Sequence, residues 1–157
     1  MNKLSNFTYE EITVGQKASY SRLVDEVAVK LFAAASGDVN PVHLDADFAA
    51  GTMFKQRIAH GMFTGGLVSA AIAMELPGPG SIYVKQDLSF RAPVFLGDTI
   101  TVNLEVVEKL DKRKFVTLNT IATNQHGKVV VKGTAQVLAP TEKLDIPRPD
   151  IPKVTVE

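Results

Sequence analysis

The residues best suited to chemistry lie in one short loop, where a carboxylate and an imidazole are five residues apart. Asp38 and His43 flank Asn40 and Pro41 in the sequence Asp-Val-Asn-Pro-Val-His. Because proline disfavours the α conformation in the residue before it, we expect an extended, stiff backbone between Asp38 and His43. Such a loop offers a candidate acid/base pair. From the spacing alone, a capping aspartate, an Asx-Pro turn and a surface histidine are favoured.

A second candidate group begins the apolar segment Gly61–Met74. The first N–H groups of a helix have no intrahelical acceptor and lie at the positive end of its dipole, so the Gly61 amide could polarise a carbonyl oxygen. Ser69, two turns further on, needs a hydrogen-bond partner if it is buried. The structural alternatives are tight packing at Gly61 and a hydrogen bond from Ser69 to its own helix.

Helices are predicted on either side of the candidate loop. Apolar residues recur at helical spacing over Val24–Ser36, with Asp25 as a plausible N-cap and Gly37 as a left-handed stop. Asp45 is expected to cap a short helix that runs through Phe48. The loop is therefore held between two local elements.

The Gly61–Met74 helix has no polar face, so it must be surrounded by other elements. Segments with strand-like patterns are expected to form the sheet that covers this helix. The expected strands are Lys17–Leu23, Ser81–Val94, Asp98–Leu110, Arg113–Thr123 and Lys128–Leu138. We predict one α+β domain over residues 1–139, with an antiparallel sheet of four or five strands curled around the helix. Four prolines in residues 140–157 predict an extended, linker-like tail.

Composition excludes several classes of partner. Seventeen basic residues balance seventeen acidic residues, which argues against nucleic acid and anionic lipid as partners. The absence of cysteine rules out disulfides and thiolate metal sites, and three scattered histidines disfavour a structural metal. The longest charge-free apolar stretch, Gly61–Met74, is shorter than the roughly 18 residues of a membrane span. Met1–Glu10 lacks the apolar core of a secretory signal, so we expect a cytoplasmic protein.

An ordered series of motifs resembles the MaoC-like dehydratases, a family that includes the (R)-specific enoyl-CoA hydratases. The resemblance covers the chain from Phe7 to Leu138 at unbroken spacing. Its motifs are Ser36–His43, Ile58–Met62, Pro77–Tyr83, Leu88–Val94 and Gly97-Asp98. The resemblance implies a hot-dog fold, in which a curved antiparallel sheet wraps a long central helix. The tail around Ala139–Lys143 is similar to the linker of fusions between such a hydratase and a phosphate acetyltransferase or butyryltransferase domain.

By this resemblance, Asp38 and His43 are the catalytic pair and the Gly61 N–H stabilises the thioester oxyanion. Ser69, Asn40 and His60 are assigned to substrate binding or orientation, with a structural role at the helix entrance favoured for His60. The third histidine, His126, lies in an Asn-Gln-His-Gly turn and is expected to be solvated.

The implied reaction is reversible syn addition of water to a trans-2-enoyl-CoA, which gives an (R)-3-hydroxyacyl-CoA. No organic cofactor or metal is expected, because the thioester itself activates the alkene. Candidate partners for the coenzyme A phosphates are Lys55, Arg57, Lys85 and Arg91, although each is also an ordinary surface charge. The resemblance further implies a homodimer or a larger homo-oligomer with the substrate tunnel along the subunit interface.

Two other functions remain open on the sequence. A hot-dog acyl-CoA thioesterase typically carries its catalytic carboxylate on the central helix, and this helix has no acid before Glu75. A non-catalytic acyl-thioester-binding subunit would be expected to lose one member of the catalytic pair. Asp38 and His43 are both present, which argues against that alternative.

Overall fold

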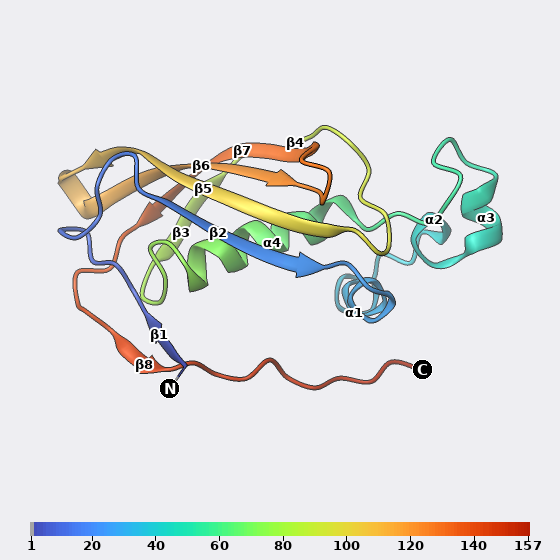
Figure 1. The fold of residues 1–157 in the computed structure, drawn as a ribbon, viewed down its shortest axis with the longest axis horizontal. Coiled ribbons are helices and arrows are strands. Elements are labelled where there is room, and N and C mark those ends of the chain that lie inside the picture. Colours follow the sequence, from blue (N-terminus) through green and yellow to red (C-terminus); the bar gives the residue numbers. More distant parts are fainter. Residues whose placement is uncertain (1) are drawn as a thin grey trace.

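The computed structural model describes residues 2–157 of the chain, and its main feature is an antiparallel sheet of six strands (Figure 1). The main path of the sheet runs in the order β2, β5, β6, β7, β3, and β4 pairs separately with β7. The strands are β2 (Lys17–Leu23), β3 (Ile82–Gln86), β4 (Ser89–Phe90), β5 (Thr99–Leu110), β6 (Phe115–Thr123) and β7 (Val129–Leu138). Along β5, buried and more exposed residues alternate, because one face of the sheet covers the core.

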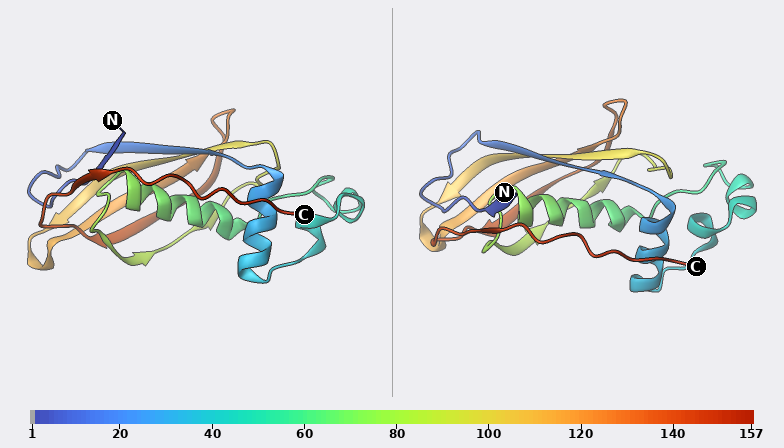
Figure 2. Two further views of the ribbon diagram at one scale, coloured as in Figure 1. Left: turned by 90° about the horizontal axis from the view of Figure 1, so that it is seen from below. Right: turned by 60° about the horizontal axis from the view of Figure 1, so that its bottom comes forward.

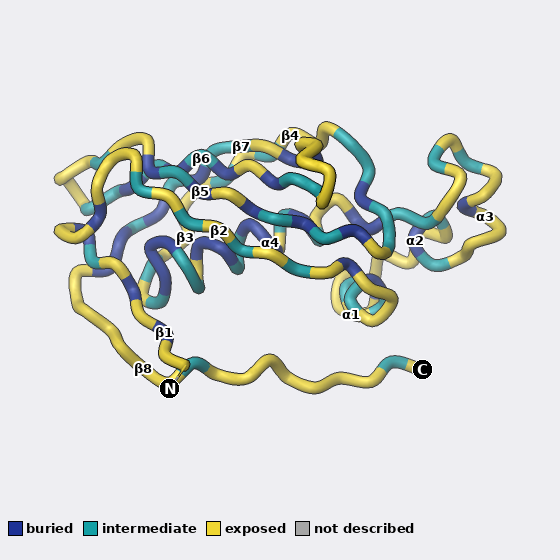
Figure 3. Tube along the Cα trace, in the orientation of Figure 1, coloured by how far each residue is buried: buried dark blue, intermediate teal, exposed yellow. Residues whose placement is uncertain are grey.

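The central helix α4 (Gly61–Met74) lies along the concave face of this sheet, with the bounds that the apolar pattern predicts (Figure 1). Val68, Ala71 and Ile72 of α4 are buried in one cluster with Val102 and Leu104 of β5. Figure 3 shows buried residues concentrated where the helix and the sheet face each other. This packing confirms the predicted hot-dog arrangement and fixes the start of α4 relative to the sheet. No helix within residues 2–157 is both long enough and apolar enough to span a membrane.

Three helices gather at the N-terminal end of α4: α1 (Glu26–Ser36), α2 (Pro41–Leu44) and α3 (Ala46–Ala50) (Figure 1). The Asp25 carboxylate accepts a hydrogen bond from the N–H of Ala28, and Gly37 ends α1 in the left-handed conformation. Asp45 caps α3 through the N–H of Phe48. All three capping predictions are confirmed.

Two local predictions are wrong. Asn40 is extended, with ψ 124°, but Pro41 opens the one-turn helix α2, so the backbone is not extended as far as His43. Proline is favoured at the first position of a helix, where no N–H is needed. The single strand predicted over Ser81–Val94 is divided into β3 and β4, and both strands pair with β7. The carbonyl of Asp87, at the break, lies where a Cβ at Gly133 of β7 would stand.

The C-terminal segment folds back against the domain. Its strand β8 (Asp145–Pro147) pairs with β1 (Lys3–Ser5), and Asn6 bonds to Leu144 through main chain and side chain. The extended, linker-like tail predicted for residues 140–157 is therefore wrong at β8, which pairs regularly with β1 although Pro147 is part of it. Beyond β8 the segment runs beside α4 and ends near α1 (Figure 2). The domain boundary at residue 139 and the fusion linker stay predictions.

Candidate active site

Asp38 and His43 are brought together by the turn between α1 and α2. The His43 Nε2 atom lies 3.9 Å from Asp38 Oδ2, slightly beyond direct hydrogen-bond distance. The His43 side chain is largely buried, whereas half of the Asp38 side chain is exposed. A small reactant can therefore reach the Asp38 carboxylate, whereas the His43 ring is enclosed by protein.

The orientation of His43 follows from a single backbone contact. Its Nδ1 atom lies 2.7 Å from the carbonyl oxygen of Ile58. A carbonyl oxygen only accepts, so Nδ1 carries the hydrogen and a neutral ring presents the lone pair of Nε2 toward Asp38. Sequence inspection could not find this partner, because any residue at position 58 supplies the same carbonyl.

Asn40 shapes the turn that carries the pair. Its N–H donates to Asp38 Oδ1 at 3.2 Å, and its own side-chain oxygen accepts from the N–H of Val42 at 3.3 Å. The N–H of His43 also donates to the Asn40 carbonyl. These contacts make Asn40 the N-cap of α2, and leave Asp38 Oδ2 free to face His43.

The Gly61 amide opens α4 immediately after the N-cap residue His60, which provides no side-chain cap. Within residues 2–157 the Gly61 N–H donates no hydrogen bond, and Gly61 is exposed. Gly61 lines a mainly apolar cavity of about 340 Å³ together with His60, Thr64 and Phe90. Thr64 Oγ1 is buried there without a partner in the described chain. An amide at the positive end of a helix in such a cavity is suited to stabilising an oxyanion.

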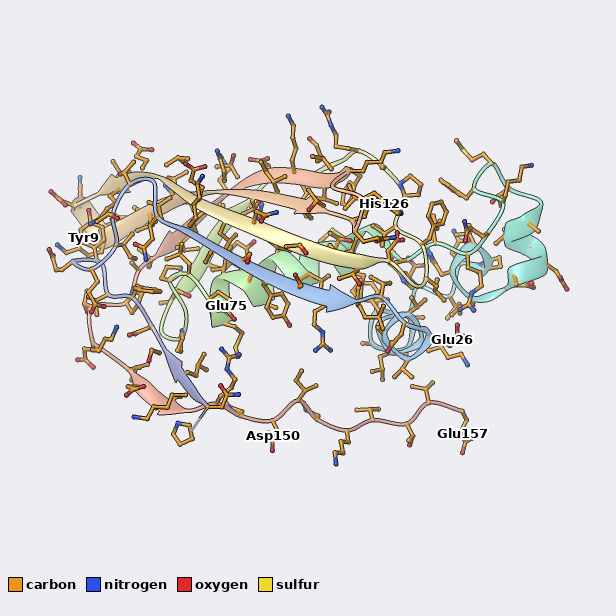
Figure 4. All side chains as sticks on the ribbon, viewed as in Figure 1. Tyr9, Glu26, Glu75, His126, Asp150 and Glu157 are labelled. Carbon is orange, nitrogen blue, oxygen red and sulfur yellow. The ribbon has the colours of Figure 1, made fainter. Side chains whose placement is uncertain are left out.

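Ser69 lies apart from the pair. It is half-buried and lines a groove with Phe32, Met62 and strand β3, and no hydrogen bond joins it to Asp38 or His43 within residues 2–157. Its orienting role therefore stays a prediction. His126, in contrast, is exposed at the turn between β6 and β7, as predicted (Figure 4).

His60 brings a third side chain of a metal-binding type to the site. Ligand atoms of Asp38, His43 and His60 lie within 4.8 Å of one another. The His60 Nε2 atom, however, is 2.9 Å from the carbonyl oxygen of Asp38, so it carries a hydrogen. The two imidazole rings are stacked 3.8 Å apart, which directs their in-plane lone pairs side by side instead of toward a common point. The arrangement is poorly suited to a shared ion and well suited to orienting His43.

Arg57 is a structural residue, and its prediction as a phosphate-binding group is wrong. Its Nε–H donates to the carbonyl oxygen of His43 at 2.7 Å, and its Nη1 donates to Glu26 of α1, also at 2.7 Å. The side chain is only 16% exposed. Arg57 therefore ties α1 and the α2 turn to the segment that precedes α4. Glu26 is labelled on α1 in Figure 4.

We predict that Glu26→Gln lowers the melting temperature most at neutral pH. The hydrogen bond from Arg57 lowers the pKa of the Glu26 carboxylate from its ordinary 4.5, and the charges of Arg57 and Lys30 act in the same direction. A pKa lowered on folding contributes stability above the unfolded value, and this stability disappears as the pH falls through the folded value. The Glu26 side chain is 46% exposed, so we expect about 1 kcal/mol or less, or about 2–4 °C at most.

Thermal denaturation between about pH 7 and about pH 3 tests this prediction. The difference between wild type and Glu26→Gln should shrink as the pH falls. Asp150→Asn is the control, because Asp150 has no ion pair in the described chain. A difference that is constant with pH, or equal to that of Asp150→Asn, would contradict the assignment.

The fold and the site together define the class of the protein. A sheet wrapped over one central helix, with a carboxylate and an imidazole joined through His60 to the first residue of that helix, is a hot-dog protein with a candidate acid/base site at its helix entrance. The chain matches the model of the MaoC like domain over residues 9–129. It belongs to the MaoC-like domain family.

Individual relatives agree with this family. An (R)-specific enoyl-CoA hydratase of Rhodospirillum rubrum is 47% identical, in a match that covers 84% of this chain and 91% of the relative. The unliganded R-hydratase of Pseudomonas aeruginosa superimposes with a TM-score of 0.95 at 52% identity, covering 99% of this chain and 100% of that chain. The (R)-hydratase of Aeromonas caviae involved in PHA biosynthesis superimposes with a TM-score of 0.81 at 44% identity. That match covers 83% of this chain and 99% of that chain.

Proposed function

We propose that this chain is an (R)-specific enoyl-CoA hydratase, a hydro-lyase that adds water reversibly to trans-2-enoyl-CoA. The observation that carries the proposal is the 3.9 Å separation of His43 Nε2 and Asp38 Oδ2, with both residues in contact with His60, which directly precedes the Gly61 amide. The 47% and 44% identities to (R)-specific enoyl-CoA hydratases support the same activity. The product class, (R)-3-hydroxyacyl-CoA, suits a role in fatty acid metabolism and in polyhydroxyalkanoate synthesis, the process named for the Aeromonas caviae relative.

The hydration needs three things from the protein. Water is held between Asp38 and His43 and loses a proton to one of them as its oxygen bonds to C3 of the enoyl thioester. Negative charge then develops on the thioester oxygen, where the Gly61 N–H stabilises it. A proton delivered from the pair to C2 restores neutrality, so a water molecule adds in full and the pair returns to its starting state.

The stereochemistry follows from the position of the pair. Because Asp38 and His43 are adjacent and both proton transfers use this one pair, the hydroxyl group and the proton reach the same face of the alkene. The addition is therefore syn, and the dehydration uses the same groups in reverse. Conjugation with the thioester activates the alkene, so the proposed reaction employs no cofactor.

A paired assay separates this activity from thioester hydrolysis. Along α4 there is no carboxylate before the C-cap residue Glu75, which disfavours the thioesterase. With crotonyl-CoA we expect loss of the enoyl absorbance without release of free thiol. Thiol release at the rate of substrate loss would establish a thioesterase, and no reaction in either assay would favour a non-catalytic binding subunit.

We further propose that two copies associate through strand β3 and the adjoining flank of α4. Within residues 2–157, strand β3 pairs with β7 on one side only, and its Ile82 and Val84 are exposed. Met62 on the neighbouring flank of α4 is 56% exposed. An open strand edge beside apolar side chains favours pairing with a second sheet. The groove that contains Ser69 would then lie at the interface.

Val84→Asp is therefore expected to convert the oligomer to a monomer and to reduce activity, because it places a charge at the proposed contact. Size-exclusion chromatography with light scattering reports the mass, beside the hydration assay. Val14→Asp is the matched control, since Val14 is 63% exposed in the loop before β2. An unchanged mass for Val84→Asp, or an equal change for both variants, would refute this interface.

The phosphates of coenzyme A need cationic neighbours, and we propose Lys55, Lys85 and Arg91 for this role. Arg91 lines the cavity beside Gly61, and Lys85 lines the groove beside Ser69. Lys55 is exposed near α3. We also propose a cytoplasmic location, where acyl-CoA substrates are available.

A further inference from the structure

We propose that His60 is a positioning residue that holds Asp38 and His43 in their working geometry; this inference rests on the hydratase activity proposed above. His60 is 3% exposed and is the residue directly before the Gly61 amide. It contacts both members of the pair through two different parts of one ring.

The first contact fixes Asp38. The His60 Nε2–H donates to the main-chain carbonyl of Asp38 at 2.9 Å, across 22 residues of sequence. His60 is also the N-cap residue of α4, so this bond links the Asp38 backbone to the start of the helix. The distance between the carboxylate and the Gly61 amide depends on that link.

The second contact fixes the ring plane of His43. The two imidazole rings stack with centroids 3.8 Å apart and an interplanar angle of 25°. The hydrogen bond from His43 Nδ1 to Ile58 restrains the ring within its plane, and the stack restrains it along the perpendicular direction. Together they hold Nε2 toward Asp38.

Phe32 supports His60 from another side. Its ring lies 4.8 Å from that of His60 and 6.1 Å from that of Phe63, so α1 and α4 both back the stack. The Nε2 atom of His60 is bonded to the main-chain carbonyl of Asp38, and Nδ1 is buried without a partner in the part of the chain described. Because the residue is only 3% exposed, neither nitrogen is open to solvent, and His60 acts through the pair instead of exchanging protons with substrate.

Three substitutions at position 60 separate the effect of the hydrogen bond to Asp38 from that of the stack on His43. His60→Ala removes both, His60→Gln keeps an N–H donor near the position of Nε2, and His60→Phe keeps a ring without a donor. A displacement of about 1 Å in a catalytic group costs about 10²-fold in rate, so kcat on crotonyl-CoA should fall about 30- to 100-fold in His60→Ala. KM should change less than about threefold, and both conservative variants should recover part of kcat.

The wild type is assayed first, which separates failure of the hydratase proposal from failure of this inference. The control is His126→Ala, an exposed histidine that should keep wild-type kcat. In a His43→Ala background, His60→Ala should have little further effect, because Asp38 and His43 act as a unit and the pair whose geometry His60 holds is already broken. Circular dichroism and the melting temperature report whether each variant is folded.

Several results would overturn the inference in an active wild type. They are a kcat for His60→Ala within about threefold of wild type, a rise in KM at constant kcat, or the same proportional loss with and without His43. If His60→Ala does not fold, the kcat values of His60→Gln and His60→Phe test the inference instead. Wild-type kcat in both of them would overturn it equally.

Discussion

Replacing either member of the pair is expected to abolish hydration while the fold remains. Proton transfer by a positioned side chain contributes about 10²–10⁴-fold, so Asp38→Asn and His43→Ala should each lower kcat on crotonyl-CoA by about 10³-fold or more. Asp38→Asn retains an oxygen that can accept the Asn40 N–H, and the Asp38 side chain is half-exposed, so the turn should survive. Loss of enoyl absorbance measures the rate, and circular dichroism measures the fold.

The double variant gives a sharper result. If the two groups act on one water molecule, the loss in the Asp38→Asn/His43→Ala variant should be close to that of either single variant, because groups that act as a unit are not additive. Independent roles would multiply the two losses. Near wild-type turnover in both single variants would show that the pair is structural.

The second large effect is expected at Gly61, where a backbone donor can be removed by proline. Gly61 is the first residue of α4, a position at which proline is favoured, and His60 before it already has the extended backbone that proline requires, with φ −60° and ψ 139°. Gly61→Pro should therefore keep the helix and lose the N–H. Removing one oxyanion donor costs about 10²–10³-fold in kcat.

Gly61→Ala is the matched control, since it adds a Cβ and keeps the N–H. The added Cβ would lie 2.9 Å from Phe90 Cε1, the far end of a side chain that is 53% exposed and free to shift. We expect a loss in Gly61→Ala about tenfold smaller than in Gly61→Pro. Equal losses would mean that crowding against Phe90, and not the donor, explains the effect, and Phe90→Ala should then restore both variants.

Sequence patterns predicted the elements that local forces determine. The bounds of α4 follow from its unbroken apolar run, and those of β2 from the strand-like segment at Lys17. Asp25 and Gly37 mark the ends of α1 because capping depends on side chain and φ at one position. Residue types and spacing singled out Asp38, His43, Gly61 and Ser69, and the motif resemblance assigned their roles. The fold brings Asp38, His43 and His60 together, while Ser69 makes no bond to them within residues 2–157.

What could not be predicted depends on backbone atoms and on contacts between distant segments. The carbonyl groups of Ile58 and Asp38 orient the two imidazoles, and a carbonyl leaves no signature in residue type. The sequence pattern indicated a surface charge at Arg57, because its partner Glu26 is 31 residues away and no local pattern joins the two. The division of the strand over Ser81–Val94 depends on the close approach of Asp87 to Gly133 across the sheet.

Hydration of crotonyl-CoA in D2O tests the central claim most directly. If one carboxylate–imidazole pair both activates the water molecule and delivers the proton, NMR of the product should show a single diastereomer of (R)-3-hydroxybutyryl-CoA, with deuterium at C2 and the hydroxyl group at C3 on the same face. Deuterium on the opposite face, a mixture of diastereomers, or an (S) product would contradict the account.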